Sequence, residues 1–284
     1  MPIRTLPLAA ALMVGAVGIA HAQNHADLMG YALAGDGMTL VTMASLAAPD
    51  EAETHALSAR LDAIAYRPVT GDLLGFSREG MIYSVDPSTG ELTDLGAAFA
   101  DGAMTSGPAV AFDFNNAIDA VRAVGSDGAN LVYFPSSFGD ERAGKVLRFT
   151  DAYYGEGDPN AGTEPLIYAN AYTNAVEGAK AGSTAQYALD ARTNALVSLA
   201  NNDGTLATIG TVTVDGEPVD LVSGGGFDIY SAQEGSDAAF AILQIADSGT
   251  SGLYSIDLQS AEATLIADLG MTGISGFAVS QGGM

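Results

Sequence analysis

Short apolar segments, rich in Tyr, Phe, Val, Ile and Leu, alternate along this chain with clusters of Gly, Asp, Asn, Ser, Thr and Pro. The clusters recur roughly every 8–12 residues, a spacing typical of many short antiparallel strands. Asp-Gly pairs stand between apolar segments at Asp36, Asp127 and Asp203, where a tight hairpin turn needs positive φ angles. The pattern therefore predicts an all-β protein.

One unit of strands and turns recurs along the chain. Its clearest copy, Leu61 to Gly96, reads as four strands, LDAIAYRP, DLLGFS, MIYSVD and ELTDLG, with turns between them. Further copies begin at Val110, Leu166 and Gly225, and GLYSIDLQSAEATLIADLG of the last copy closely repeats GMIYSVDPSTGELTDLG of the first. Repeated four-stranded units of this length predict a β-propeller.

The two ends of the chain are incomplete in a complementary way. The segment DLMGYALAGDGMTLVTMAS resembles the second and third strands of a unit, and ETHALSA a fourth, whereas GISGFAVSQ near the C-terminus resembles a first strand alone. Joined, they complete one more unit and leave no long sheet edge open. We therefore predict five four-stranded blades, with the strand near Phe277 beside the strand near Tyr31. Six blades, one of them degenerate, are the alternative.

The N-terminal residues have the pattern of a secretory signal peptide. Arg4 precedes an apolar run over residues 6–20, and AHA precedes Gln23. The alternative is a membrane anchor, but the run is shorter than the roughly 20 residues that a span needs. We expect a signal peptide over residues 1–22 and a single propeller domain over 23–284. The mature protein would then be periplasmic or secreted, with no membrane span.

Composition narrows the range of partners. The 284 residues carry a formal net charge of −24, which disfavours nucleic acid and anionic lipid as partners. The acidic residues are scattered, which favours a role in solubility over a dedicated ion store. The sequence has no Cys, so disulfides, thiol chemistry and Cys-bound metals are excluded.

Familiar catalytic motifs are missing from the sequence. The three His residues, His21, His25 and His55, have no spaced partner, and no G-x-S-x-G or P-loop motif is present. The glycines at 224–226 precede a predicted strand and not a helix, which disfavours a phosphate site. The sequence therefore leans away from an enzyme and assigns no catalytic residue.

Three carboxylates stand in or beside predicted first strands, which line the centre of a propeller: Asp62, Asp113 and Asp228. Converging carboxylates would support acid–base chemistry or bind Ca²⁺. The favoured alternative is structural, with each Asp accepting backbone N–H groups or pairing with an Arg such as Arg67 or Arg122. Recurrent aromatic residues in the first strands are expected to fill the core between blades, namely Tyr66, Phe112, Tyr172 and Phe227.

One predicted hairpin concentrates polar residues. Arg122 would either bind an anionic ligand group as a bidentate fork or, as we favour, form an ion pair with Asp119 that locks the hairpin. Tyr172 and Asn174 of the next unit would join either arrangement. The candidate ligand-binding set is therefore Asp113, Asn115, Asp119, Arg122, Asn130, Tyr172 and Asn174.

Three segments carry a family resemblance. AFDFNNAIDAVRAVGSDGANLVYFP, DPNAGTEPLIYANAYTN and NNDGTLATIG resemble a bacterial family known as domain of unknown function 4394, and the similarity runs from about Leu28 to Val279. Asn116 stands where the family usually has Pro, and Val132 where it usually has Arg. The resemblance implies an exported, propeller-like repeat protein and no established activity.

Together these features predict an exported, non-catalytic binding module. Its site would lie at the channel mouth or on the loop Asp151 to Pro165, and its partner would be a small molecule, a glycan or an envelope protein. We expect no cofactor, with Ca²⁺ as the alternative. The other functions left open are a glycosidase- or lactonase-like hydrolase that uses channel carboxylates, and a structural protein of the cell envelope.

Overall fold

The computed structural model describes residues 25–282, and its regular structure is almost entirely β. The helices in this range are three single 3₁₀ turns, η1 (His25–Asp27), η2 (Pro49–Glu51) and η3 (Asn201–Asp203). None of the helices in this range has the length and apolar character to cross a bilayer. The predicted all-β class is confirmed, while the predicted signal peptide lies outside the described residues.

Strand pairing arranges four antiparallel meanders that are continuous in sequence. Their strands are β4 (Ala63–Arg67), β5 (Asp72–Ser77), β6 (Met81–Val85) and β7 (Leu92–Asp94); β9 (Val110–Asn115), β10 (Ala120–Gly125), β11 (Asn130–Tyr133) and β12 (Lys145–Arg148); β14 (Ile167–Tyr172), β15 (Gln186–Asp190), β16 (Ala195–Leu199) and β17 (Thr205–Thr211); and β20 (Leu221–Ser231), β21 (Asp237–Ile245), β22 (Ser251–Ile256) and β23 (Glu262–Asp268).

A fifth meander combines the two ends of the described chain. Its strands, in spatial order, are β24 (Ser275–Gln281), β1 (Leu28–Ala34), β2 (Thr39–Met43) and β3 (Glu53–Ala56). β24 pairs antiparallel with β1, with Ala278 opposite Tyr31 and Phe277 opposite Ala32. The predicted pairing between the strand near Phe277 and the strand near Tyr31 is therefore confirmed.

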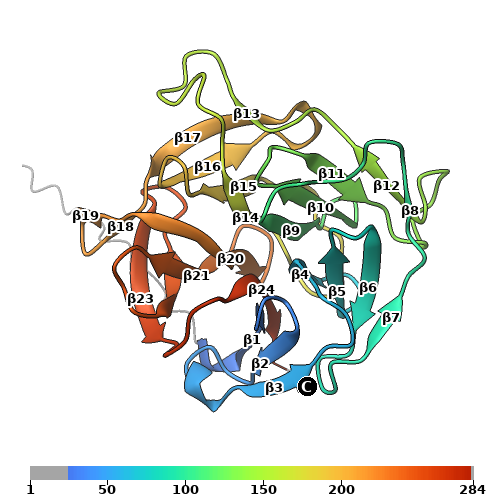
Figure 1. Ribbon diagram of the computed structural model, residues 1–284, viewed down its shortest axis with the longest axis horizontal. Helices are drawn as coiled ribbons and strands as arrows, with labels where there is room; N and C mark the ends of the chain where they lie inside the picture. The colour runs from blue at the N-terminus through green and yellow to red at the C-terminus, as the bar shows by residue number, and fades with distance from the viewer. Residues whose placement is uncertain (1–24, 283–284) are drawn as a thin grey trace, which may run out of the picture.

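The meanders surround a common centre in a propeller-like arrangement (Figure 1). The strands β4, β9, β14, β20 and β24 lie innermost, and β3, β7 and β23 lie towards the rim. Each innermost strand contacts the next around the centre, from β24 to β4, β9, β14, β20 and back to β24. Every meander therefore has a neighbour on both sides.

The segments that lead into three of the meanders also protect their outer edges. β8 (Ala98–Phe99) pairs parallel with β12, β13 (Tyr153–Tyr154) with β17, and β18 (Thr213–Val214) with β23. β19 (Glu217–Pro218) extends the last of these as a hairpin. Such short added strands cover backbone groups that would otherwise be open to pairing with another chain.

The hydrophobic core lies between neighbouring meanders. A separate cluster of buried apolar side chains fills each of the five junctions, because each strand presents one apolar face to its neighbour. Phe112 packs against Phe76 of the preceding meander, with 5.6 Å between ring centroids, and Phe227 lies in the cluster between the β14 and β20 meanders. The core role predicted for Phe112 and Phe227 is confirmed.

Glycine allows the closest approach between two meanders, at the contact of β20 with β24. A Cβ atom on Gly226 would lie 2.3 Å from the backbone nitrogen of Phe277. Only a residue without a side chain fits there, because the nearest atoms belong to backbone that cannot move aside. Gly224, two residues earlier on β20, is different, since its Cβ atom would lie 3.5 Å from the nearest neighbour.

This difference generates a matched pair of variants. We expect Gly226→Ala to lower the free energy of unfolding by about 3 kcal/mol, as in overpacked cores. Gly224→Ala should change it by less than about 1 kcal/mol. Urea unfolding followed by tyrosine fluorescence measures both variants. Equal stability of the two would contradict the close approach of β20 to β24.

Candidate functional site

Arg122, on β10, is buried and is held by neutral acceptors. Its Nε donates to the hydroxyl of Tyr172 at 2.8 Å and its Nη2 to Oδ1 of Asn202 at 2.8 Å, while its Nη1 donates to Oδ1 of Asn130. The ring of Phe149 lies 5.8 Å from the guanidinium carbon. The ion pair predicted between Arg122 and Asp119 is wrong.

Asp119 instead pairs with Arg67 of the neighbouring meander. Nε and Nη2 of Arg67 donate to the two carboxylate oxygens of Asp119 at 2.7 and 2.6 Å, and both side chains are 10% exposed. Arg122 lies on β10, whereas Asp119 lies in the turn before that strand, with a φ of 58°. Asp119 therefore ties two meanders together and does not lock its own hairpin.

Asp113 and Asp228 bind backbone N–H groups of the next innermost strand. Oδ2 of Asp113 accepts from Tyr172 at 2.7 Å, and Oδ2 of Asp228 accepts from Val279 at 2.5 Å. Asp62 is paired with Arg78, whose Nε donates to its Oδ1 at 2.9 Å. The favoured structural role of these three carboxylates is confirmed by their contacts.

The carboxylates do not all converge. Asp113 and Asp228 line one small cavity of about 10 Å³ together with Tyr66 and Glu177, whereas Asp62 lines another cavity. Burial raises the pKa of Asp228 to about 7, and burial together with the charge of Asp228 raises the pKa of Asp113. A cavity of that size holds about one water molecule, so no sugar ring fits between this pair.

The remaining predicted site residues also form hydrogen bonds with other parts of the chain. Nδ2 of Asn130 donates to the carbonyl of Thr150 at 2.9 Å, and Oδ1 of Asn115 accepts from the Thr184 hydroxyl at 3.0 Å. Asn174 donates from Nδ2 to Ser183 and accepts at Oδ1 from Gly235. The seven predicted residues therefore hold neighbouring segments of the chain together.

The two other locations considered from the sequence, the loop Asp151 to Pro165 and His55, show fewer features of a binding site. In the loop Asp151 to Pro165, Asp158 accepts hydrogen bonds from Asn160 and Thr208, which fold the loop onto its own meander. His55 lies on the outer strand β3, with Nε2 3.9 Å from Glu53. Within residues 25–282 no three His, Asp or Glu side chains are placed to hold a metal ion.

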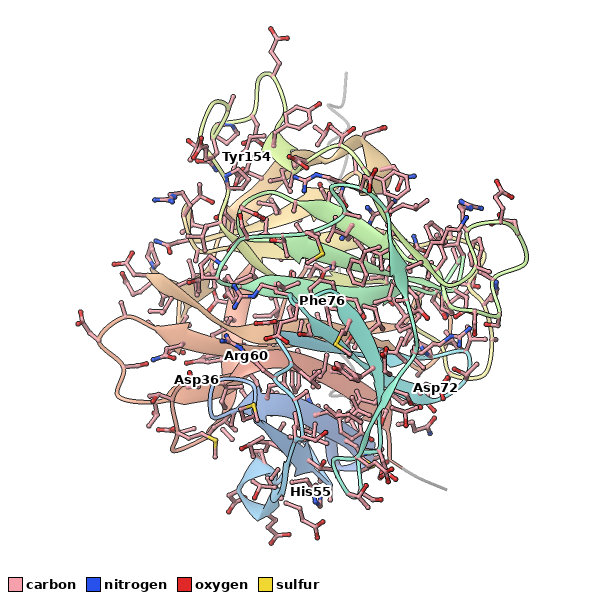
Figure 2. The ribbon with its side chains drawn as sticks, turned by 45° about the vertical axis from the view of Figure 1, so that its right-hand side comes forward. Asp36, His55, Arg60, Asp72, Phe76 and Tyr154 are labelled. Carbon is pink, nitrogen blue, oxygen red and sulfur yellow. The ribbon has the colours of Figure 1, made fainter. Side chains whose placement is uncertain are left out.

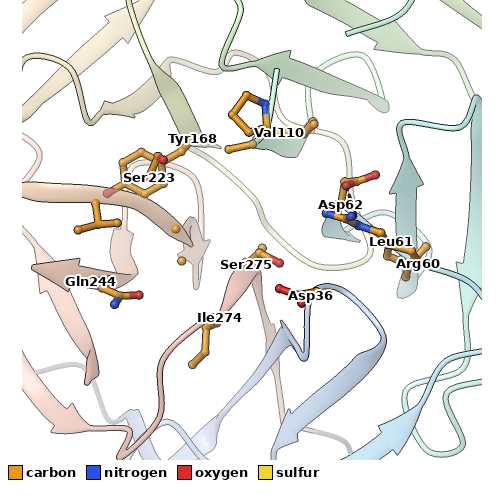
Figure 3. A pocket seen from close by; sticks show the side chains of 17 residues that line it. Asp36, Arg60, Leu61, Asp62, Val110, Tyr168, Ser223, Gln244, Ile274 and Ser275 are labelled. Atoms are coloured by element: carbon orange, nitrogen blue, oxygen red, sulfur yellow. Dashed lines mark ion pairs between the residues drawn. The ribbon is translucent and has the colours of Figure 1, made fainter. Parts of the chain in front are cut away.

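A larger cavity opens at the opposite end of the innermost strands (Figure 3). We call it the channel-mouth cavity; its volume is about 230 Å³ and its polar lining comprises Asp36, Arg60, Asp62, Tyr168, Ser223, Gln244 and Ser275. Figure 2 shows Asp36 and Arg60 on one side of the molecule, and Asp72, beyond the far end of β4, on the other. Residues from all five meanders, or from the segments that lead into them, meet here.

The polar groups of the channel-mouth cavity are largely unengaged. The side chains of Asp36, Ser223, Gln244 and Ser275 have no hydrogen-bond or ion-pair partner among the described residues. The hydroxyl of Tyr168 is buried, with 2% of the residue exposed, and also lacks a partner among them. A buried hydroxyl without a partner costs about 1–3 kcal/mol, so these groups are suited to a ligand or water.

Asn170 extends the same feature deeper into the centre. It lies two residues after Tyr168 on β14, and its amide oxygen and nitrogen both lack partners within the described chain. It lines a second cavity of about 10 Å³, which shares Val110, Tyr168 and Gly276 with the channel-mouth cavity. The sequence signal for this region is the run Gly224 to Gly226, which marks close backbone approach.

A family model described as Domain of unknown function (DUF4394) matches residues 40–278 of the sequence. No curated protein matches the chain significantly.

Several solved structures resemble the fold at low sequence identity. A chain of a nidogen/laminin complex is 11% identical, with a TM-score of 0.46 over 90% of this chain and 100% of that one. PorZ, a surface component of the type-IX secretion system of Porphyromonas gingivalis, is 16% identical, with a TM-score of 0.36 over 81% of this chain and 26% of that one. A Bacteroides thetaiotaomicron protein of unknown function is 14% identical, with a TM-score of 0.40 over 71% and 43%. These likenesses carry no argument about function.

The bidentate pair between Arg67 and Asp119 predicts a stability effect. Asp119 has a φ of 58°, which Asn tolerates well, so Asp119→Asn removes the charge without straining the turn. We expect the free energy of unfolding to fall by about 3 kcal/mol, because a buried guanidinium loses its partner. Asp140→Asn, at an exposed ion pair, should cost far less in the same urea titration, because water screens that pair. A similar loss in both would contradict the assigned role.

The buried carboxylate pair predicts a pH dependence. Below about pH 4, Asp228 is protonated in both the folded and the unfolded chain. Between about pH 4 and 7 the unfolded chain releases this proton and the folded chain keeps it, so folded stability falls. The loss reaches about 4 kcal/mol.

Asp228→Asn isolates this effect. The difference between the free energy of unfolding of Asp228→Asn and that of the wild type should rise between pH 4 and 7. The lost backbone acceptor adds a cost that is the same at every pH, so it does not affect this rise. Asp101→Asn, at an exposed position, should run parallel to the wild type. A constant difference for Asp228→Asn across this range would contradict the raised pKa.

Proposed function

The chain belongs to the family described as domain of unknown function (DUF4394), and we propose that it is an exported, five-bladed β-propeller that binds a small polar ligand without catalysis. Each meander would be one blade, and the pairing of β24 with β1 would close the ring. The cycle of contacts among the five innermost strands supports this blade count.

The proposed binding function rests on one observation, the difference in hydrogen bonding of polar side chains between the two ends of the innermost strands. At the end near Asp113, polar side chains are bonded to one another and to the backbone. At the channel mouth, Ser223, Gln244 and Ser275 face a cavity of about 230 Å³ without partners. Clefts with a few convergent polar groups are where small ligands usually bind.

The same contrast favours binding over hydrolysis. A carboxylate pair that cleaves a glycosidic bond must flank its substrate with space for it. Asp113 and Asp228 are each 5% exposed and flank a cavity of about one water molecule. Asp62 is held by Arg78, so it is a poor general acid or base. We retain Ca²⁺ and an envelope protein as alternatives for the partner.

Export is part of the proposal. The pattern of residues 1–22 favours removal of a signal peptide and release to the periplasm or the medium. The absence of Cys means that folding there needs no disulfides, and the net charge of −24 favours solubility. A binding protein in this location would meet small nutrients, glycans and envelope components.

The experiment uses a variant that fills the proposed site. Gly224 lines the cavity, has no positive φ and has room for a Cβ atom, so Gly224→Leu should fold normally and occupy the cavity. Gly139→Leu, with open space around a loop glycine, is the matched control.

We expect at least one compound in a thermal-shift screen of small polar molecules, divalent ions and envelope glycans to raise the Tm of the wild type and of Gly139→Leu. The same compound should leave the Tm of Gly224→Leu unchanged. A screen with no hit, or a hit that Gly224→Leu binds equally well, would overturn binding at the channel mouth. A shift by Ca²⁺ alone would favour the cation alternative.

A further inference from the structure

We infer that the ligand of the channel-mouth cavity is an uncharged, polyhydroxylated molecule of the size of a single sugar residue. This ligand class rests on the binding function proposed above. The volume of about 230 Å³ is many times the space that one water molecule needs. A compact polar molecule fits such a space, and a polymer would enter only with its end.

The charges around the cavity balance. Asp62 receives the Nε of Arg78 at 2.9 Å and lies 3.3 Å from the Nε of Arg60. Asp36 adds a second carboxylate to the lining, and Arg78 holds Asp62 from outside the lining, so these two carboxylates and two guanidinium groups balance in charge. A charged ligand would lose its hydration without gaining a net opposite charge, which disfavours ions.

The donor and acceptor types of the lining indicate hydroxyl groups. Asp36 offers acceptors only, whereas Arg60, whose side chain is 51% exposed, offers donors only. The hydroxyls of Ser223 and Ser275, which also line the cavity, do both. A ligand hydroxyl also donates and accepts at one atom, whereas carboxylates and phosphates only accept and ammonium groups only donate.

The wall of the cavity also presents an aromatic ring. Tyr168 lines the cavity, while its hydroxyl and the amide of Asn170 are buried within the wall without partners among the described residues. The pairing of β14 is irregular between Ile167 and Ala169, next to Tyr168. Ordered water inside the wall would satisfy these buried groups and leave the ring of Tyr168 as the surface that a ligand meets.

The apolar part of the lining suits the carbon skeleton of a sugar. Leu61, Pro108 and Ile274 stand among the polar groups, together with the ring of Tyr168. A sugar presents C–H groups between its hydroxyls, so it contacts a mixed lining of this kind without burying unpaired polar atoms. A wholly apolar ligand would leave Ser223, Gln244 and Ser275 unsatisfied.

The test uses matched sets of ligands with the exported chain. Calorimetric titration would compare neutral sugars and polyols (glucose, galactose, mannose, inositol) with glucuronate, galacturonate, glucosamine and serine. We expect saturable binding of at least one neutral compound and at least tenfold weaker binding of its charged analogue. Gly224→Leu should abolish this binding and Gly139→Leu should retain it.

Two further variants address the named groups. Ser275→Ala should weaken the neutral ligand about tenfold without lowering the Tm of the free protein, because it removes only a hydroxyl that lines the cavity and has no partner among the described residues. Asp36→Asn should weaken it by a similar factor. Tyr153→Phe, on the outer strand β13, is the control and should bind as the wild type does.

The outcomes separate this ligand class from the binding function itself. Tighter binding of an anionic, cationic or zwitterionic compound, abolished by Gly224→Leu, would overturn the ligand class and leave the binding function in place. A neutral sugar that binds Gly224→Leu as well as the wild type would overturn the assigned cavity. Failure of every neutral compound to bind overturns the inference.

Discussion

The structure depends on the packing of each meander against its two neighbours around a common centre. A single meander has one apolar face on each side and cannot bury both alone. The first and last strands of the described chain solve this problem together, because β24 pairs with β1 and completes the meander that lies between β20 and β4. Without that pairing, two apolar faces and two sheet edges would be open to water.

Polar contacts reinforce the same junctions. Asp113 and Asp228 each accept a backbone N–H from the next innermost strand, and Arg67 reaches Asp119 across another junction. These contacts bury charge, and the raised pKa of Asp228 is the electrostatic consequence. Asn116, which stands where the family usually has Pro, donates from its buried amide to the carbonyl of Asn174 in the next meander. The polar residues in this part of the chain therefore hold the fold together.

The two ends of the innermost strands consequently differ in what they can do. Where the inter-meander polar contacts gather, most donors and acceptors are already used, with Asn116 Oδ1 and Gln186 Nε2 unpaired among the described residues, and only a water-sized space remains beside Asp228. At the other end, glycines on β20 and at position 276 keep side chains out, and the space is larger. The side chains of Ser275 and Gln244 line that space without partners among the described residues. Rigid strands hold them in place, which is what a binding site requires.

The sequence by itself determined the strands, the repeat and the pairing of the chain ends, because these follow from local periodicity and turn residues such as Gly80 and Gly96. It also identified polar residues that matter, including Arg122 and Asp113. Only the tertiary structure decided their partners. The neighbouring meander that Asp119 reaches from its turn depends on how separate meanders are set against each other. The channel-mouth cavity could not be predicted from the sequence either. Asp36, Tyr168 and Ser275 are far apart in sequence, and none of them belongs to a recognisable motif. They form a site only where the ends of different strands meet around the centre.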